Sequence, residues 1–146
     1  MRIILKLIIL FFSIFVHAGE KEKLPQKPEC NDGLRSVSIL NLIVTPEKYD
    51  GFCVRVQGVF RAEFEGNALF LNKESFENYI GENSITLTFN DHLVKHVGNL
   101  EKFNGEYQLI EGIFHFESIT SGGSAGYISG IYRLSDFYHL VEFYRK

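Results

Sequence analysis

The sequence predicts an all-β fold with short helices, and three observations support this prediction. The chain contains fourteen Phe, seven Tyr and thirteen Gly but only three Pro, a composition that favours strands joined by tight bends. Several apolar runs alternate with polar residues in the two-residue period of a strand. The length of 146 residues suits a single domain, and a hydrophobic content of 45% suits a folded chain.

The first eighteen residues have the pattern of a secretory signal peptide. Arg2 and Lys6 precede an apolar run over residues 7–16, and Val16-His17-Ala18 then offers a cleavage site. A membrane anchor is the alternative, although the run falls short of the roughly 20 residues that a span requires. We therefore expect cleavage after Ala18, a periplasmic or secreted location, and no stable membrane span in the mature chain.

The charge balance argues against nucleic acid as a partner. The chain carries 15 basic and 18 acidic residues, and removing residues 1–18 takes away Arg2 and Lys6 but no acidic residue. The mature chain then has 13 basic against 18 acidic residues, a net charge of −5. Phosphate backbones are bound by clustered Lys and Arg, so we expect a protein or a small extracytoplasmic ligand instead.

Export also changes what the two cysteines predict. Residues 19–35 have the composition of an extended leader, and residues 36–146 form the predicted domain. Cys30 and Cys53 enter an oxidising compartment, where an even pair more often forms a disulfide than remains as two buried free thiols. Arg55 and Gln57 share the strand face of Cys53, so Cys53 should point away from the barrel interior towards the leader.

The beginning of the domain predicts a helix followed by a strand. Ser36 is a suitable N-cap for a helix that runs to about Val44, and Thr45-Pro46 ends it. The apolar stripe of this helix comprises Val37, Leu40 and Val44, widened by Ile39 and Ile43. The strand covers residues 52–61, where Phe52, Val54 and Val56 alternate with Cys53, Arg55 and Gln57.

The rest of the domain predicts four further strands, over residues 68–71, 84–89, 106–117 and 127–134. Helical segments are expected over residues 73–80, with Phe76, Tyr79 and Ile80 as the apolar side, and within residues 91–103. Residues 63–67 and 120–126 read as a turn and a loop. The tail 135–146 is compatible with either a strand or a helix.

Two glycines suggest how these five strands close. Gly58 and Gly112 interrupt the two longest apolar strands near their middles, where a glycine usually marks a bulge or bend. A small barrel needs such bends, because one strand must pair in both halves of a curled sheet. The prediction is an OB-like five-stranded barrel preceded by a short helix, with a small open sandwich as the alternative.

A resemblance points the same way. The segments SILNLIVTPEKYDGFCVRVQGVF, EFEGNALFLNKESFEN, NGEYQLIEGIF and SGGSAGYISGIYRL, within residues 36–134, resemble an uncharacterised group of small exported bacterial proteins. The shared patterns V-R-V-x-G, F-E-G-N-A-L and N-G-x-Y-x-L-I-E-G consist of turn glycines and core residues. The resemblance implies an OB-like barrel and carries no catalytic residues.

No combination of residues predicts catalysis more strongly than it predicts an ordinary structural role, so we expect a non-enzymatic protein without a cofactor. The strongest alternative is a metal-assisted hydrolase, because His92 and His96 lie four apart and would share one helix face. An HExxH motif is missing from the sequence, and an exposed helix face is the favoured explanation of the pair.

Binding is the expected role, through the loops that OB-like barrels use for recognition. These loops cover residues 61–67 and 118–126. The acidic and partly aromatic first loop suits a protein surface, a cationic peptide or a sugar, and an inhibitor or immunity protein is one such role. The candidate binding residues are Arg61, Glu63, Phe64, Glu65, Asn67, Tyr127 and Tyr132.

Overall fold

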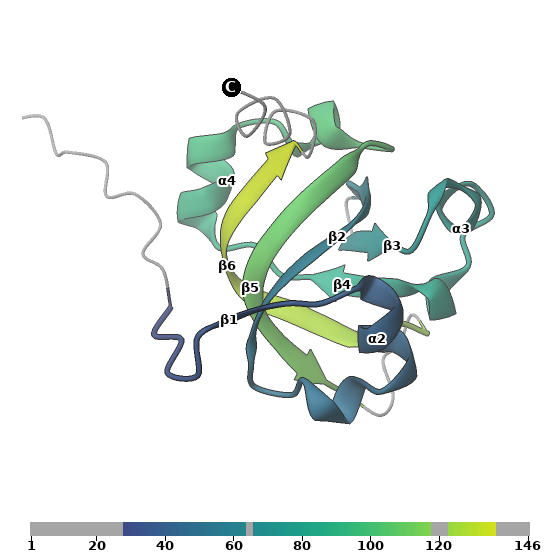
Figure 1. The fold of residues 1–146 in the computed structure, drawn as a ribbon. Helices are drawn as coiled ribbons and strands as arrows, with labels where there is room; N and C mark the ends of the chain where they lie inside the picture. The colour runs from purple at the N-terminus through teal and green to yellow at the C-terminus, as the bar shows by residue number, and fades with distance from the viewer. Residues whose placement is uncertain (1–27, 64–65, 118–122, 137–146) are drawn as a thin grey trace, which may run out of the picture.

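A computed structural model describes residues 28–63, 66–117 and 123–136 of the chain (Figure 1). The predicted signal peptide, its cleavage site and the tail from residue 137 lie outside these residues. Six strands are present: β1 (Leu34–Ser36), β2 (Cys53–Arg61), β3 (Asn67–Phe70), β4 (Ser84–Leu87), β5 (Tyr107–Phe116) and β6 (Gly126–Asp136). Their order is β1-β2-β3-β4-β6-β5, and β5 also pairs with β2. Five strands therefore close into the predicted OB-like barrel, with β1 as an additional strand.

Strand β2 belongs to both halves of the barrel. Its first residues pair with the parallel strand β1, its last residues pair with β3, and β5 pairs with it from Cys53 to Val59. The change of partner occurs around Gly58, where an added Cβ would lie 2.5 Å from the carbonyl oxygen of Phe70. A side chain has no room at this position, which confirms that Gly58 permits a close approach of two strands.

Gly112 has the corresponding role in β5. The register between β5 and β6 shifts between Glu111 and Ile113, and an added Cβ on Gly112 would lie 2.7 Å from the carbonyl oxygen of Ser129. A step of two residues in β5, from Glu111 to Ile113, is matched by a step of four in β6, from Ser129 to Arg133, so the extra residues lie in β6. Gly112 therefore permits a close approach of β6 beside this irregularity.

Short helices close the barrel. They are α2 (Ile39–Val44), α3 (Lys73–Glu77) and α4 (Asp91–Val97), with 3-10 turns η1 (Pro46–Lys48), η2 (Gly81–Asn83) and η3 (Leu100–Phe103). Helix α4 lies between the third and fourth barrel strands, and it lies on the opposite side of the barrel from α2 (Figure 1). Leu93 of α4 and both Ile39 and Leu42 of α2 enter the core, whose centre includes Val54, Phe60, Ile110 and Phe114.

The first helix begins later than the sequence predicts. Ser36 ends β1, and the amide of Val37 donates to the carbonyl of Arg55 across the β1–β2 pair. Ser38 is the N-cap, and its side chain accepts from the amide of Asn41. Backbone pairing with β2 therefore removes Ser36 from the helix, and the last leader residues form a strand.

Two predicted apolar faces are also wrong in part. Helix α2 buries Ile39 and Leu42, whereas Leu40 and Val44 are 51% and 67% exposed. The predicted stripe assumed a helix beginning at Ser36, and the shorter helix presents a different face to the barrel. After α3, Tyr79 is 64% exposed although the sequence predicts it on the apolar side.

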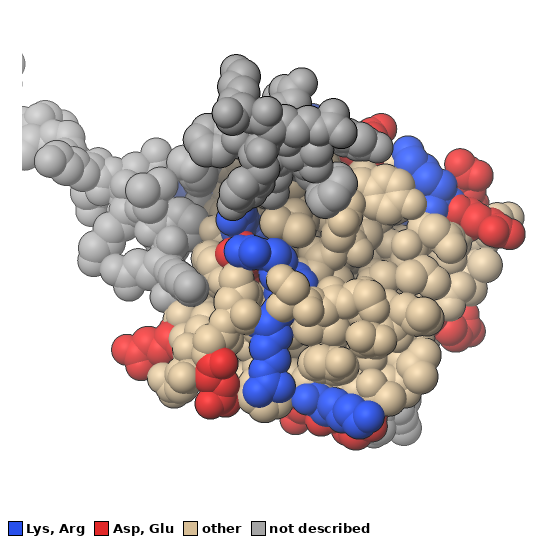
Figure 2. Space-filling model, in the orientation of Figure 1, with Lys and Arg blue, Asp and Glu red and all other residues tan. Residues whose placement is uncertain are grey.

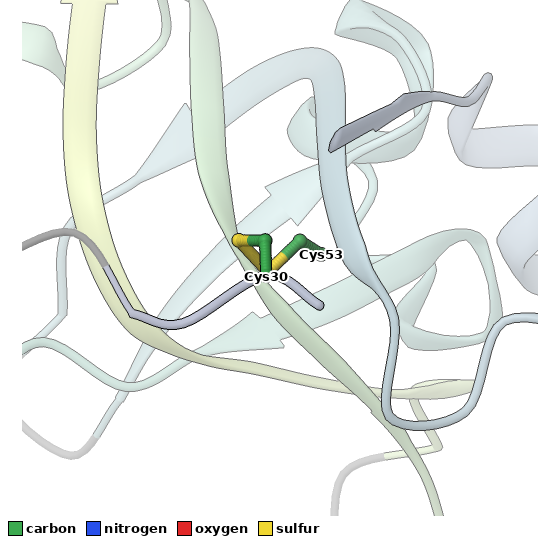
Figure 3. The surroundings of a disulfide bond; sticks show 2 residues. All are labelled: Cys30 and Cys53. Atoms are coloured by element: carbon green, nitrogen blue, oxygen red, sulfur yellow. A yellow bond between two sulfur atoms is a disulfide. The ribbon is translucent and has the colours of Figure 1, made fainter. Parts of the chain in front are cut away.

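The predicted disulfide between Cys30 and Cys53 is present (Figure 3). Cys53 lies opposite Ile113 of β5, and Val54, its neighbour in the sequence, belongs to the core. Cys53 itself is 4% exposed, because the leader covers it. An added Cβ on Gly130 of β6 would approach both Ile113 and Pro28, so the leader crosses the outside of the barrel here.

Candidate functional site

The predicted binding residues do not gather into one site. Arg61 ends β2 rather than lying in the loop, and it is buried, while Glu63 is exposed beside it. Asn67 begins β3, where it pairs with Leu87 of β4. Tyr127 is half-buried, and its ring stacks on His115 with centroids 4.7 Å apart. Phe64, Glu65 and residues 118–122 of the second loop lie outside the described residues.

Arg61 links the barrel to the segment that follows β3, and we call its contacts with that segment the clamp. Its side chain is 8% exposed and pairs with Glu63 at 3.2 Å. One terminal nitrogen donates to the carbonyl of Phe76. The guanidinium group also lies 4.1 Å from the ring centroid of Phe76 and 3.5 Å from that of Tyr79. Ring stacking combined with hydrogen bonds from separate nitrogens suits the planar guanidinium group, and these contacts hold α3 against β2.

Tyr79 has an unusual backbone conformation for an aromatic residue. Its φ angle is +54°, and no other non-glycine residue that the structure describes has a positive φ. A side chain with a Cβ in the left-handed region costs roughly 1–2 kcal/mol. The Arg61 stack offsets this cost, and it fixes an aromatic ring that remains 64% exposed.

Exposed apolar and acidic residues lie near Tyr79 in the sequence and on the element that packs against the segment after it. Ile80 follows it at 36% exposure, and η2 then packs against α2, which carries the exposed Leu40 and Val44. Figure 2 shows a broad field without charged side chains on this face, with charged groups at its edge. We refer to Tyr79 and Ile80, together with the exposed Glu74, Glu77 and Glu82, as the Tyr79 surface.

The local charge of the Tyr79 surface is negative. Between residues 73 and 82 the three glutamates outnumber the single Lys73, which itself lies 3.9 Å from Glu106. Glu63 adds little to this balance because Arg61 compensates it. An exposed apolar centre with an acidic margin is complementary to an apolar group flanked by cations.

A second arrangement of charges crosses the outer face of the barrel. Arg55 of β2 pairs with Glu111 of β5, and Glu111 pairs in turn with Arg133 of β6. Directly opposite residues of neighbouring strands point to the same face. The Nε of Arg55 lies 2.7 Å from Oε1 of Glu111, and Nη1 of Arg133 lies 3.2 Å from the same oxygen. We call these three residues the ionic row.

The ionic row affects Tyr132. Burial and the adjacent carboxylate of Glu111 raise the pKa of Tyr132 to about 12, and the two arginines oppose this shift only in part. Tyr132 is half-buried beside the row, so the phenol stays neutral at physiological pH. The sequence placed Tyr132 among the binding candidates, and the structure places it next to the one buried carboxylate of β5.

The candidate metal ligands lie on the predicted helix. His92 and His96 both belong to α4, whose N-cap Asn90 accepts from the amide of Leu93. Their side chains lie outside the described residues. Within the described part of the chain, no three His, Cys, Asp or Glu side chains are grouped closely enough to hold a metal ion. No helix in that part is long and apolar enough to cross a membrane.

Other polar pairs that could carry chemistry have structural partners. Nε2 of His115 lies 2.8 Å from Oγ of Ser129 on the neighbouring strand. Ser124 is buried, and its hydroxyl lies 2.9 Å from that of Thr86 and donates to the carbonyl of Gly126. These bonds fasten β6 to β5 and β4.

The fold and these two surfaces define a class: a small, disulfide-linked, OB-like barrel. Comparison with models of protein families, with curated protein sequences and with solved structures finds no match to this chain. The assignment of function therefore depends on the described residues alone.

Proposed function

We propose that this chain is an exported, non-catalytic binding protein that recognises a protein or peptide partner through the Tyr79 surface. The partner presents an apolar or aromatic anchor with basic residues beside it. The observation that carries this proposal is the geometry of Tyr79, an exposed ring in a left-handed conformation over the buried Arg61. A ring fixed before binding loses little conformational entropy when a partner covers it.

The charge of the Tyr79 surface indicates which kind of partner it favours. The glutamates of the Tyr79 surface repel phosphate groups and attract Lys and Arg, so nucleic acid is disfavoured. Aromatic residues are frequent among the few side chains that dominate binding energy, and Tyr79 has the exposure that this role requires. The disulfide supports an oxidising, extracytoplasmic location.

Export has its own test. We expect the mature N-terminus at or near Gly19, with residues 1–18 removed by cleavage after Ala18. The intact mass of the exported protein measures this directly. A mass that includes Met1 would contradict the signal-peptide assignment, and with it the exported location.

Selection from a random peptide display library tests the binding proposal. The exported mature chain is the target, and all enriched peptides are then measured against the Tyr79→Ala variant. We expect enriched sequences to combine Lys or Arg with an aromatic or long aliphatic residue. Their affinity should fall about tenfold or more in Tyr79→Ala, which corresponds to loss of one dominant contact.

The matched control is Phe116→Ala, which removes another exposed aromatic side chain from a different part of the barrel. This variant should bind the selected peptides as the unsubstituted chain does. Thermal melting of both variants checks that they fold. The proposal fails if no peptide family is enriched, or if peptides bind Tyr79→Ala and the unsubstituted chain equally well.

A further inference from the structure

The ionic row carries more positive than negative charge. Two guanidinium cations face one carboxylate, so the row has a net charge of +1, and the neutral phenol of Tyr132 does not change this sum. The chain as a whole has a net charge of −3. Figure 2 shows a band of Lys and Arg side chains along this face of the molecule. A local cationic group on an acidic protein is a candidate contact point for an anion.

The carboxylate of Glu111 is the fixed part of the row. Its side chain is only 5% exposed, and it lies on the central strand of the three. A buried carboxylate is stable only when it is paired, so both arginines are held to Oε1. Glu111 therefore positions the two cations side by side without being reachable itself.

Within the part of the chain that the structure describes, both arginines have hydrogen-bond donors that no residue uses. Arg55 uses Nε towards Glu111, and neither of its terminal nitrogens donates to any residue that the structure describes. Arg133 uses Nη1 alone within the same described residues. Their side chains are 40% and 36% exposed, so solvent and ligands reach the remaining donors.

We propose that Arg55 and Arg133 form a binding site for a carboxylate, presented by an acidic side chain or a chain terminus of a peptide or protein. The planar donor edge of a guanidinium group matches the two oxygens of a carboxylate. A net charge of +1 balances a monoanion, whereas phosphate groups and polyanions require more cations than the row supplies. This site does not depend on the Tyr79 surface, and each can fail without the other.

Nuclear magnetic resonance of the ¹⁵N-labelled mature chain tests this site, because the Nε–H signals of arginines report on each guanidinium group. The probes are N-acetylglycine, inorganic phosphate and chloride at equal ionic strength. We expect saturable shifts of the Arg55 and Arg133 signals at millimolar N-acetylglycine, smaller shifts with phosphate and none that saturate with chloride.

Arg133→Gln should abolish the saturable shift at Arg55, because one guanidinium group alone does not form the site. Arg133→Lys keeps the charge but loses the planar donor edge, and should weaken binding several-fold. Arg35→Gln is the matched control, since Arg35 lies over the Phe52 ring, 3.4 Å from its centroid.

Three results would overturn the proposal. The first is an equal response to chloride, which would indicate screening of charge only. The second is an undiminished shift of the Arg55 signal in the Arg133→Gln variant. The third is tighter binding of phosphate than of N-acetylglycine, which would assign the site to phosphate instead of a carboxylate.

Discussion

Arg55 and Arg61 lie on the same strand, six residues apart and on the same outward face, yet their surroundings differ. Arg61 is 8% exposed and is surrounded by the rings of the α3 region, a carbonyl and Glu63. Arg55 is 40% exposed, and among the described residues its side chain pairs with Glu111 alone. Gly58 separates them, at the point where β2 leaves β1 and meets β3. The residue type alone therefore does not determine what an arginine does on β2. The elements that cover each half of the strand determine it.

The largest loss of stability is expected from a substitution at Gly58, where the two halves of β2 meet. Gly58→Val places a β-branched side chain against the backbone of β3, whose Phe70 oxygen lies 2.5 Å from the Cβ position. Backbone cannot move away without breaking the β2–β3 pairing. We expect a loss of about 3 kcal/mol or more in the free energy of unfolding, measured by urea denaturation, although Val is intrinsically preferred to Gly in strands.

Gly112→Val should have a similar effect, because the added atoms would meet Ile128 and the carbonyl of Ser129. Thr88→Val is the control, since Thr88 is exposed just after β4 and has no such neighbour. It should change stability by about 0.5 kcal/mol at most. Glycine variants that melt at or above the temperature of the unsubstituted chain would show that these bends are not required for closure.

The next largest loss of stability is expected from breaking the disulfide, which holds the half of β2 that contains Arg55. Reduction of the disulfide, or Cys53→Ala, releases the leader from this half and should cost roughly 3 kcal/mol in the chain-entropy model. Hydrogen exchange gives the regional readout. Exchange should accelerate at the Val37 amide, which donates to Arg55, and remain slow at the Gly105 amide, which donates to Phe60.

The double variant Cys30→Ala/Cys53→Ala is the control for reductant, and its melting temperature should not respond to added thiol. The regional assignment is wrong if reduction accelerates exchange equally at the Val37 and Gly105 amides, because β2 would then respond as one unit.

Substitution of the two arginines should cost different amounts of stability. Arg61→Met should reduce stability by about 2 kcal/mol, because the Phe76 carbonyl loses its side-chain donor and the strained Tyr79 loses its stacking partner. Arg55→Met should cost about 1 kcal/mol or less, because Arg133 still pairs with Glu111 and Arg55 is half exposed. Urea denaturation of both variants measures the difference. Equal costs, or a larger cost for Arg55→Met, would contradict the distinction between a buried clamp and an exposed donor.

Much of the barrel could be predicted from the sequence because its signals are local. The alternation around Val54, the glycine at position 58 and the helix between the third and fourth strands each appear within a few residues of the chain. The disulfide was predictable for a similar reason, since the signal-peptide pattern and the strand face of Cys53 are both local features of the sequence. The start of α2 was not, because the pairing of Ser36 depends on a strand that begins at Cys53.

The two candidate surfaces could not be predicted, because both depend on distant packing. The clamp joins Arg61 to residues of the α3 region only when that region folds back over β2. The ionic row depends on the register shift between β5 and β6 that lies beside Gly112. If the Ile113–Ser129 register continued without a shift, Ile131 rather than Arg133 would lie opposite Glu111. Gly112 marks the neighbourhood of the register shift in the sequence, but the size of the shift depends on how β5 and β6 pack together.

The smallest expected effect is a pH dependence confined to the Arg55 half of the molecule. The pKa of Tyr132 is raised to about 12 by burial and by the charge of Glu111, whereas an unfolded tyrosine titrates near 10. The folded protein thus keeps a proton that the unfolded chain releases above pH 10. The stabilising contribution is complete below pH 10 and is lost as the pH rises towards 12. Solvent screening reduces its size, because Tyr132 is only half-buried.

The measurement is urea unfolding of the unsubstituted chain and of Tyr132→Phe between pH 9 and about 11.5, where the other tyrosines contribute equally to both proteins. The stability of the unsubstituted chain relative to Tyr132→Phe should decline across this range. A difference that stays constant would mean that Tyr132 titrates normally and that Glu111 does not act on it.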